Sequence, residues 1–253
     1  MSVVEYSVKD RIASIVLNRP DKLNAINAQM RDELFRAFHD FEGNPDAWLA
    51  VITGAGGAFS VGHDLQEMGV PAGDSSGASI EDLYVLQSRI WKPVLAAING
   101  YCLAQGGGIA LASDIRIASE SARFGWPQAR RGISSISGPA MLASRIPLNH
   151  ALEFLFTGDL IDAQAAYRLN LVNKVVPHDR LMAVVDEYAQ KILQNAPLAI
   201  RGIKEAAVKG QALPLAQRVA LGSEVFRRVQ DTADAREGLQ AFREKRPPVF
   251  KGQ

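Results

Sequence analysis

The sequence has 253 residues, a formal net charge of +1 and one cysteine, Cys102. A chain of this length can bury a substantial core as one large domain, or as one domain with an appendage. Its balanced charge predicts no nucleic-acid partner, and its single cysteine excludes an intrachain disulfide and favours a reducing compartment.

The N-terminal residues MSVVEYSVKDR lack the pattern of a signal peptide, in which basic residues precede an apolar run. The longest uncharged run, 93–113, could span a bilayer by its length. Its glycines, prolines and polar residues favour buried soluble structure instead. We therefore expect a cytoplasmic protein with no membrane partner.

The first elements of the chain alternate between strands and helices. Alternating apolar residues predict two β-strands over 3–8 and 12–17. After a loop, Asn27 is placed to cap a helix with one apolar face. The elements predicted next are a strand over 48–53, a turn into a short helix over 58–65, a mobile Gly/Pro/Ser-rich loop over 69–79 and a helix over 80–91.

The stretch from Pro93 to Asp114 predicts a strand over 94–98, a glycine-rich turn at Gly106–Gly108 and a short buried helix over 109–112. Such a crossover brings bare backbone N–H groups to a helix N-terminus, where the helix dipole favours negative charge. The stretch therefore predicts a site for an anion, or for an oxygen that becomes anionic during a reaction. The alternative is a tight crossover whose glycines serve packing alone.

The remaining chain changes from mixed structure to helices. Strands are predicted over 114–118 and 171–176, with an irregular segment over 122–137 between them. From about residue 177 onward every predicted element is a helix. The sequence therefore predicts an α/β core over 1–195 with a helical C-terminal region over 196–253.

Two glycine clusters do not complete the dinucleotide-binding pattern G-x-G-x-x-G. The third glycine would fall on Phe59 after Gly54 and Gly56, and on Leu111 after Gly106 and Gly108. We therefore expect no nicotinamide cofactor. The four histidines show no metal-ligand spacing with each other or with a carboxylate pair, so we also expect no metal.

Several segments in register resemble the enoyl-CoA hydratase/isomerase (crotonase) family. They are LNRPDKLNAI at 17–26, FSVGHDL at 59–65, NGY at 99–101 with Gly106, FG at 124–125, and EGLQAF with KRP at 237–247. The resemblance implies a β-β-α superhelix with a C-terminal helical trimerisation region. It also implies an acyl-CoA thioester as ligand, coenzyme A as part of the substrate rather than a separate cofactor, and a homotrimer or hexamer.

The resemblance assigns an oxyanion hole to the backbone N–H groups of His63 and Gln105. Taken by themselves, the residues around His63 favour an exposed loop histidine over a functional one. The coenzyme's adenine and pantetheine arm would follow the first segments, and its phosphates would meet the tail, of this or a neighbouring subunit. The substrate-binding residues implied in this way are Lys22, Leu23, Ala25, Asp64, Leu65, Gln66, Trp126, Phe242 and Lys245.

Three positions that carry catalytic acids in members of this family are neutral here. The two glutamates of the hydratases fall on Gly108 and Gln128, and the acid of the isomerases falls on Ile136. Gln128 can orient a water but cannot accept its proton. In the same segment, Arg130 or Arg131 could pair with a substrate carboxylate, or both could be solvated surface charges.

These residues predict a lyase or isomerase that acts on an acyl-CoA thioester through an oxyanion hole that stabilises an enolate. One alternative is a decarboxylase of malonyl-type CoA esters. Gly62-His63-Asp64 resembles the methylmalonyl-CoA decarboxylase members, although the tyrosine of those members falls on Ser135. Another alternative is a non-catalytic protein that binds acyl-CoA.

Overall fold

The computed structural model describes residues 2–67 and 79–253. The loop predicted over 69–79 therefore lies outside the described residues, except for Ser79. The chain forms two compact units, one of residues 1–89 and 94–186, the other of residues 90–93 and 187–253. Within the described ranges, no helix is both long and apolar enough to cross a bilayer.

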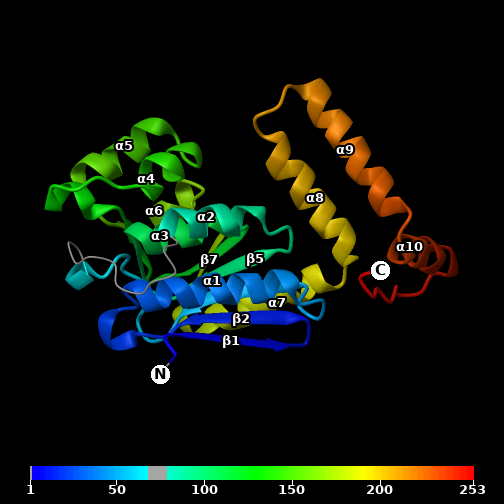
Figure 1. The fold of residues 1–253 in the computed structure, drawn as a ribbon, viewed down its shortest axis with the longest axis horizontal. Coiled ribbons are helices and arrows are strands. Elements are labelled where there is room, and N and C mark those ends of the chain that lie inside the picture. The colour runs from blue at the N-terminus through cyan, green and yellow to red at the C-terminus, as the bar shows by residue number, and fades with distance from the viewer. Residues whose placement is uncertain (1, 68–78) are drawn as a thin grey trace. The chain divides into compact units, whose positions relative to one another are not determined.

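A six-stranded sheet is the base of the first unit (Figure 1). Two antiparallel strands form one edge, and the other strands continue in parallel. Every residue of β5 is buried, as expected of a parallel strand covered on both faces. In spatial order the strands are β1 (Val4–Lys9), β2 (Ile12–Leu17), β3 (Leu49–Gly54), β5 (Val94–Ile98), β7 (Ile115–Ser119) and β10 (Lys174–Val176).

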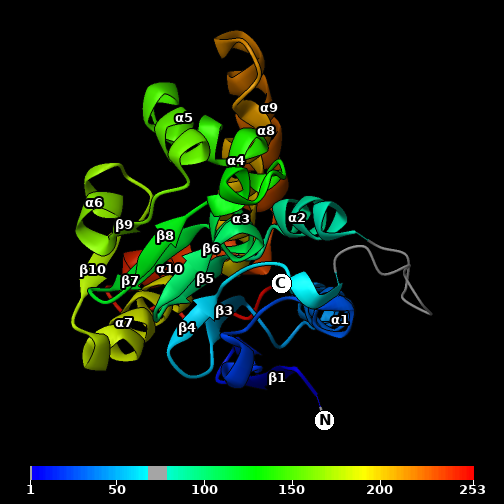
Figure 2. The same ribbon diagram turned by 90° about the vertical axis from the view of Figure 1, so that its left-hand side faces the viewer.

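A second sheet was not predicted, because its strands are too short to show a periodic pattern. Three strands of this second sheet directly follow β3, β5 and β7 along the chain. The first unit therefore repeats a motif of two strands followed by a helix (Figure 2). The segment over 122–137 is accordingly not irregular throughout. The strands of this sheet are β4 (Ala58–Ser60), β6 (Tyr101–Leu103), β8 (Arg123–Gly125) and β9 (Ile161–Asp162).

Helices connect the strands of the first unit. The predicted cap is confirmed, since the side chain of Asn27 accepts a hydrogen bond from the N–H of Met30 (2.9 Å). The α-helices are α1 (Ala28–Gly43), α2 (Ile80–Arg89), α3 (Ala104–Ala112), α4 (Ser137–Ala140), α5 (Leu148–Thr157), α6 (Ala163–Arg168) and α7 (Leu181–Leu193), and α7 continues into the second unit. The 3-10 turns are η1 (Pro20–Lys22), η2 (Leu65–Glu67), η3 (Pro127–Arg131), η4 (Leu142–Ser144) and η5 (His178–Arg180).

The glycine triplet lies inside α3, which begins at Ala104, so the prediction of a glycine-rich turn was wrong. Each glycine packs against a different segment. A Cβ atom built on Gly106 would lie 2.6 Å from the carbonyl oxygen of Ser60, one on Gly107 would lie 2.7 Å from the ring of Trp126, and one on Gly108 would lie 2.5 Å from the ring of Tyr84. Glycine disfavours helices by about 1 kcal/mol. Close packing against three different segments outweighs this preference.

The second unit contains α8 (Pro197–Gly210), α9 (Leu215–Gln230) and α10 (Ala233–Glu244). Helices α8 and α9 pack closely at Gly202, where a built Cβ would lie 2.7 Å from Val225. Val225 is therefore buried between the two helices. The C-terminal tail returns to α10, where the buried carboxylate of Asp234 accepts hydrogen bonds from the N–H groups of Lys251 and Gly252 (both 2.7 Å).

Candidate active site

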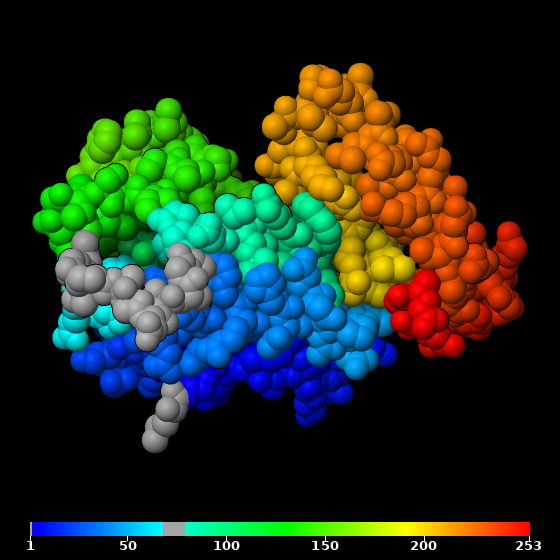
Figure 3. All heavy atoms as spheres, in the orientation of Figure 1, coloured from blue at the N-terminus to red at the C-terminus, as the bar shows by residue number. Residues whose placement is uncertain are grey.

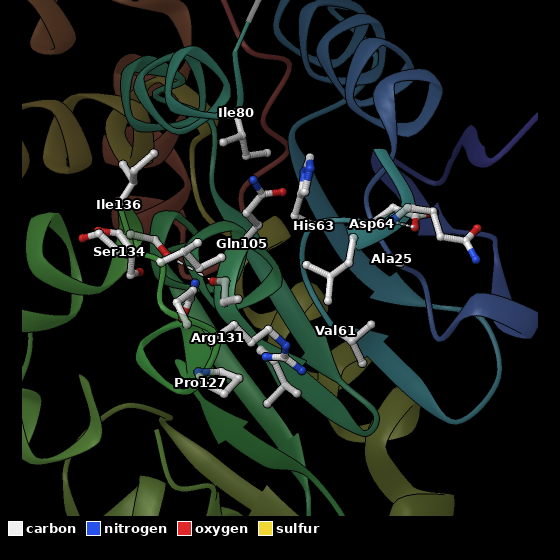
Figure 4. Close-up of a pocket in the computed structure, with 18 of the residues that line it drawn as sticks. Ala25, Val61, His63, Asp64, Ile80, Gln105, Pro127, Arg131, Ser134 and Ile136 are labelled. Atoms are coloured by element: carbon white, nitrogen blue, oxygen red, sulfur yellow. Dashed lines mark hydrogen bonds between the residues drawn. The ribbon is translucent and has the colours of Figure 1, made fainter. Parts of the chain in front are cut away.

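A cavity of about 620 Å³ lies in the first unit (Figure 4). Figure 4 shows Ala25 and Asp64 on the blue wall of this cavity and Pro127 and Arg131 on the green wall. The predicted site residues that line the cavity are Lys22, Ala25, His63, Asp64, Leu65, Gln66, Gln105 and Gln128.

The other predicted residues lie elsewhere. Leu23 is exposed, and Trp126 is buried behind the cavity wall with 2% of its surface accessible. Gly108 is buried beneath Tyr84. Phe242 and Lys245 belong to the second unit, on and directly after α10, and their role at the coenzyme phosphates stays a prediction.

A buried asparagine, Asn24, fixes the loop that forms the blue wall. Its backbone takes a left-handed φ of 55°, which asparagine tolerates better than most residues. Its side-chain oxygen accepts from the N–H of Arg19 (2.8 Å), and its amide nitrogen donates to the carbonyl oxygens of Ala55 (2.9 Å) and Ala58 (2.8 Å). One side chain therefore holds this loop against the end of β3 and the start of β4.

The backbone N–H of His63 faces away from its pairing partner, Ile26. The two residues form a parallel bridge, in which the N–H of Ile26 donates to the oxygen of Gly62 (2.8 Å) and the N–H of Asp64 donates to the oxygen of Ile26 (3.0 Å). In this pairing the N–H of His63 points to the opposite side. It has no backbone acceptor among the described residues, so it is available to a ligand.

A second donor, the N–H of Gln105, lies in the first turn of α3. N–H groups in a first turn have no acceptor within the helix. A Cβ atom built on Gly62, whose φ is +90°, would lie 3.0 Å from Gln105 N and 2.8 Å from the Cβ of Ala104. The glycine therefore lets the His63 segment reach the start of α3. Two N–H donors from adjacent segments are the arrangement that stabilises an oxyanion, and Figure 4 shows His63 beside Gln105.

Two side chains support this helix start, Ser137 in the cavity lining and Trp126 buried behind it. Ala104 has a positive φ of 51°, a sparsely populated conformation for a residue with a side chain. The hydroxyl of Ser137 donates to its carbonyl oxygen (3.1 Å) and accepts from the indole N–H of Trp126 (3.0 Å). Ser137 and Trp126 thereby fix the peptide group that joins Ala104 to Gln105 and carries the N–H donor.

The phenol of Tyr84 occupies the space above Gly108. Its Cζ and Oη atoms both lie 2.5 Å from a Cβ atom built on that glycine, and Oη donates to the carbonyl oxygen of Gln105 (3.1 Å). Burial raises the pKa of Tyr84, so the hydroxyl stays protonated at neutral pH. Nothing in the sequence connects α2 with the glycine triplet, so Tyr84 was not predicted as a site residue.

Asp64 is the one carboxylate among the described residues that line the cavity. Burial alone would raise the pKa of Asp64. The hydrogen bond from the N–H of Gln66 and the guanidinium of Arg19, 3.0 Å away, outweigh burial and lower it. The nearby carboxylate of Glu67 accepts from the N–H of Ala28 (2.8 Å) and so caps α1.

Three further polar side chains face the cavity. The side-chain oxygens of Gln105 and Gln128 are buried without a hydrogen-bond partner among the described residues. Buried polar atoms normally have a partner, so a ligand or a water is expected at both. The imidazole of His63 lines the same space (Figure 4). The sequence analysis considered only the backbone of His63.

The comparisons with known proteins cover almost the whole chain. Residues 7–253 match the sequence profile of the enoyl-CoA hydratase/isomerase family. The chain is 34% identical over 253 residues to an (E)-benzylidenesuccinyl-CoA hydratase of Thauera aromatica, covering 98% of this chain and 99% of the relative. It is 35% identical over 241 residues to a short-chain-enoyl-CoA hydratase of Clostridium acetobutylicum, covering 93% and 92%.

Solved structures agree with these relatives. An enoyl-CoA hydratase/isomerase from Mycobacterium paratuberculosis superposes with a TM-score of 0.92 at 35% identity, covering 99% of each chain. An enoyl-CoA hydratase from Bacillus anthracis superposes with a TM-score of 0.92 at 31% identity, covering 99% of this chain and 100% of the other. The predicted fold is thereby confirmed, and this chain belongs to the enoyl-CoA hydratase/isomerase family, with the crotonase fold.

Proposed function

We propose that this chain acts on acyl-CoA thioesters by stabilising an enolate. The observation that carries the proposal is the pair of backbone N–H donors from His63 and Gln105. A thioester oxygen between them gains negative charge as the enolate forms, so both hydrogen bonds strengthen in the transition state. The names of the relatives support a thioester ligand, since the Thauera and Clostridium proteins are both named as CoA hydratases.

The coenzyme would lie along the blue wall of the cavity. There Lys22, Ala25 and the segment from His63 to Gln66 line the cavity, and the resemblance assigns both segments to coenzyme binding. The acyl group would then extend past the two donors toward η3 and the segment 133–137, which supply the green wall.

The chemistry at the acyl group would differ from that of a two-glutamate hydratase. Gly108 and Gln128 stand where the resemblance implies those glutamates, and neither can take a proton from water. Apart from Lys22 on the coenzyme path, the acid or base side chains among the described residues that line the cavity are Tyr84, which is protonated, Asp64, which is paired, and the imidazole of His63. We therefore propose a lyase or isomerase reaction through the enolate, with hydration of simple enoyl thioesters as a slow reaction.

The buried hydroxyl of Tyr84 favours one second candidate, decarboxylation of malonyl-type CoA esters. The tyrosine of the decarboxylase members falls on Ser135, and Tyr84 supplies a phenol to the same cavity from another helix. In this reaction the carbon–carbon bond breaks, carbon dioxide leaves, and the electron pair enters the thioester as an enolate, which then takes a proton at its α-carbon. Release of carbon dioxide from methylmalonyl-CoA, without hydration of crotonyl-CoA, would select this candidate.

The first prediction concerns the ligand class. Because the two donors and the Lys22–Ala25 loop suit a CoA thioester, we expect acyl-CoA to bind with a dissociation constant in the micromolar range, about −8 kcal/mol. We expect little affinity for NAD, since neither glycine cluster completes the dinucleotide pattern. Calorimetry that finds tight NAD binding and no acyl-CoA binding would contradict the proposal. If acyl-CoA binds but no thioester is turned over, the chain is a non-catalytic acyl-CoA-binding protein.

The second prediction concerns assembly, for which we propose a trimer or a dimer of trimers. The surface of α8 and α9, yellow to orange in Figure 3, carries large apolar side chains, and large exposed apolar patches mark interfaces. The sequence places Ile200, Ile203, Val219, Leu221, Val225 and Phe226 on these apolar faces, but Val225 is buried. The exposed members are Ile203, Val208, Leu215, Val219 and Phe226. Light scattering at micromolar concentration should give at least three times the mass of one chain, and a monomer would exclude the proposal.

A further inference from the structure

Two neighbouring arginines at the end of η3 have different surroundings. Arg130 donates to the carbonyl oxygen of Thr157 (2.7 Å) and pairs with the carboxylate of Asp159. Arg131 lines the cavity, and in the described part of the chain no carboxylate lies within ion-pair distance of its guanidinium. The sequence left the two residues equivalent, whereas the structure places only Arg131 at the cavity.

The charges around the cavity favour an anion beside Arg131. The one lining carboxylate of the described residues, Asp64, already pairs with Arg19. The phenol of Tyr84 is neutral. Among the described residues, the guanidinium of Arg131 is therefore the uncompensated charge of the green wall, and Figure 4 shows it extending from that wall into the cavity, toward Val61.

The position of Arg131 separates it from the proposed coenzyme path. Lys22, the other lining cation, ends η1 beside Ala25 on the blue wall. Arg131 ends η3 on the green wall, next to the segment that carries Ile133 and Ser134. An acyl group held at the two backbone donors would therefore have its far end directed to the green wall.

We propose that Arg131 binds a carboxylate on the acyl group, so that the substrates are CoA monothioesters of dicarboxylic acids. This inference rests on the proposed function. The guanidinium presents paired N–H donors in a plane, and these match the two oxygens of a carboxylate. Isoleucine side chains at 133 and 136 line the same wall and suit the methylene groups between thioester and carboxylate.

Matched pairs of saturated thioesters test this inference. Succinyl-, glutaryl- and adipyl-CoA are compared by calorimetry with butyryl-, pentanoyl- and hexanoyl-CoA, in which a methyl group replaces the carboxylate. At least one diacid thioester should bind roughly ten- to a hundredfold more tightly than its monoacid partner, the range of a charge-assisted hydrogen-bonded pair. Arg131→Gln should remove this preference, and Arg131→Lys should keep part of it.

Arg130→Gln is the matched control, because Arg130 is engaged outside the cavity and its loss should leave the preference intact. Thermal unfolding of each variant checks that the fold is kept. If all six thioesters bind and no diacid binds better than its partner, the inference is wrong and the proposed function stands. If Arg131→Gln weakens all six equally, Arg131 contacts the coenzyme and the inference is again wrong. If none of the six binds, the proposed function itself fails.

Discussion

Hydration of crotonyl-CoA by this chain should be slower than in a two-glutamate relative by at least about four orders of magnitude. Each positioned acid or base contributes roughly 10²–10⁴-fold to a rate, and the two positions concerned hold Gly108 and Gln128. The oxyanion donors remain, so the chain should still bind thioesters that form enolates. The rate is measured from the loss of the conjugated enoyl thioester absorbance, with a two-glutamate relative assayed in parallel.

Restoring hydration requires three substitutions rather than two. Gln128→Glu supplies one carboxylate at the cavity wall. Gly108→Glu alone should fail, because its Cβ would lie 2.5 Å from the Tyr84 ring and 2.8 Å from the Cβ of Ser137. Adding Tyr84→Ala removes the nearer contact, and the segment that carries Ser137 must still shift to admit the glutamate. We expect the triple variant to hydrate crotonyl-CoA faster than Tyr84→Ala with Gln128→Glu, which is the matched control.

Rapid hydration by the native chain would show that another base exists. The sequence alone points to Asp64 or Glu67 as that base, and the structure replaces Glu67 by His63. His63 and Asp64 line the cavity, whereas the carboxylate of Glu67 caps α1. Asp64→Asn and a substitution of the His63 imidazole by glutamine would then identify the base, since neither alters the backbone donor of residue 63.

Gly62→Ala should lower enolate binding by about 10²–10³-fold, the contribution of one oxyanion donor. The added methyl group would lie 2.8 Å from the Cβ of Ala104 and 3.0 Å from Gln105 N, so the two donor segments must move apart. Binding of acetoacetyl-CoA, a thioester that ionises to an enolate, reports the change directly. Butyryl-CoA, which does not ionise in this way, should lose less affinity.

Gly132→Ala is the control for backbone strain. Gly132 has a φ of +71°, and a Cβ atom built there meets nothing within 4 Å. Both variants therefore have a left-handed backbone cost of roughly 1–2 kcal/mol, but only Gly62→Ala puts a methyl group between the donor segments and pushes them apart. Equal loss of acetoacetyl-CoA binding in the two variants would contradict the assigned oxyanion geometry.

The sequence alone determined the elements whose signals are local. Strands β1, β2, β3 and β5 carry enough alternating or apolar residues to be predicted, and Asn27 marks the start of α1 through its own side chain. The family resemblance located the two candidate donors in the same way, because the motifs around His63 and Gln105 are contiguous. The second sheet was not predictable, since two- and three-residue strands have no period to detect.

Only the tertiary structure decided what surrounds those donors. The glycine triplet is helical because three distant segments pack against it, whereas helix propensity alone placed the start of the helix after the triplet. The position above Gly108 is filled by Tyr84, which lies 24 residues earlier in the chain, as the numbering of the sequence shows. Arg130 and Arg131 are adjacent and chemically identical, yet only one faces the cavity. Their surroundings depend on contacts between segments far apart in the chain, and no local pattern encodes such contacts.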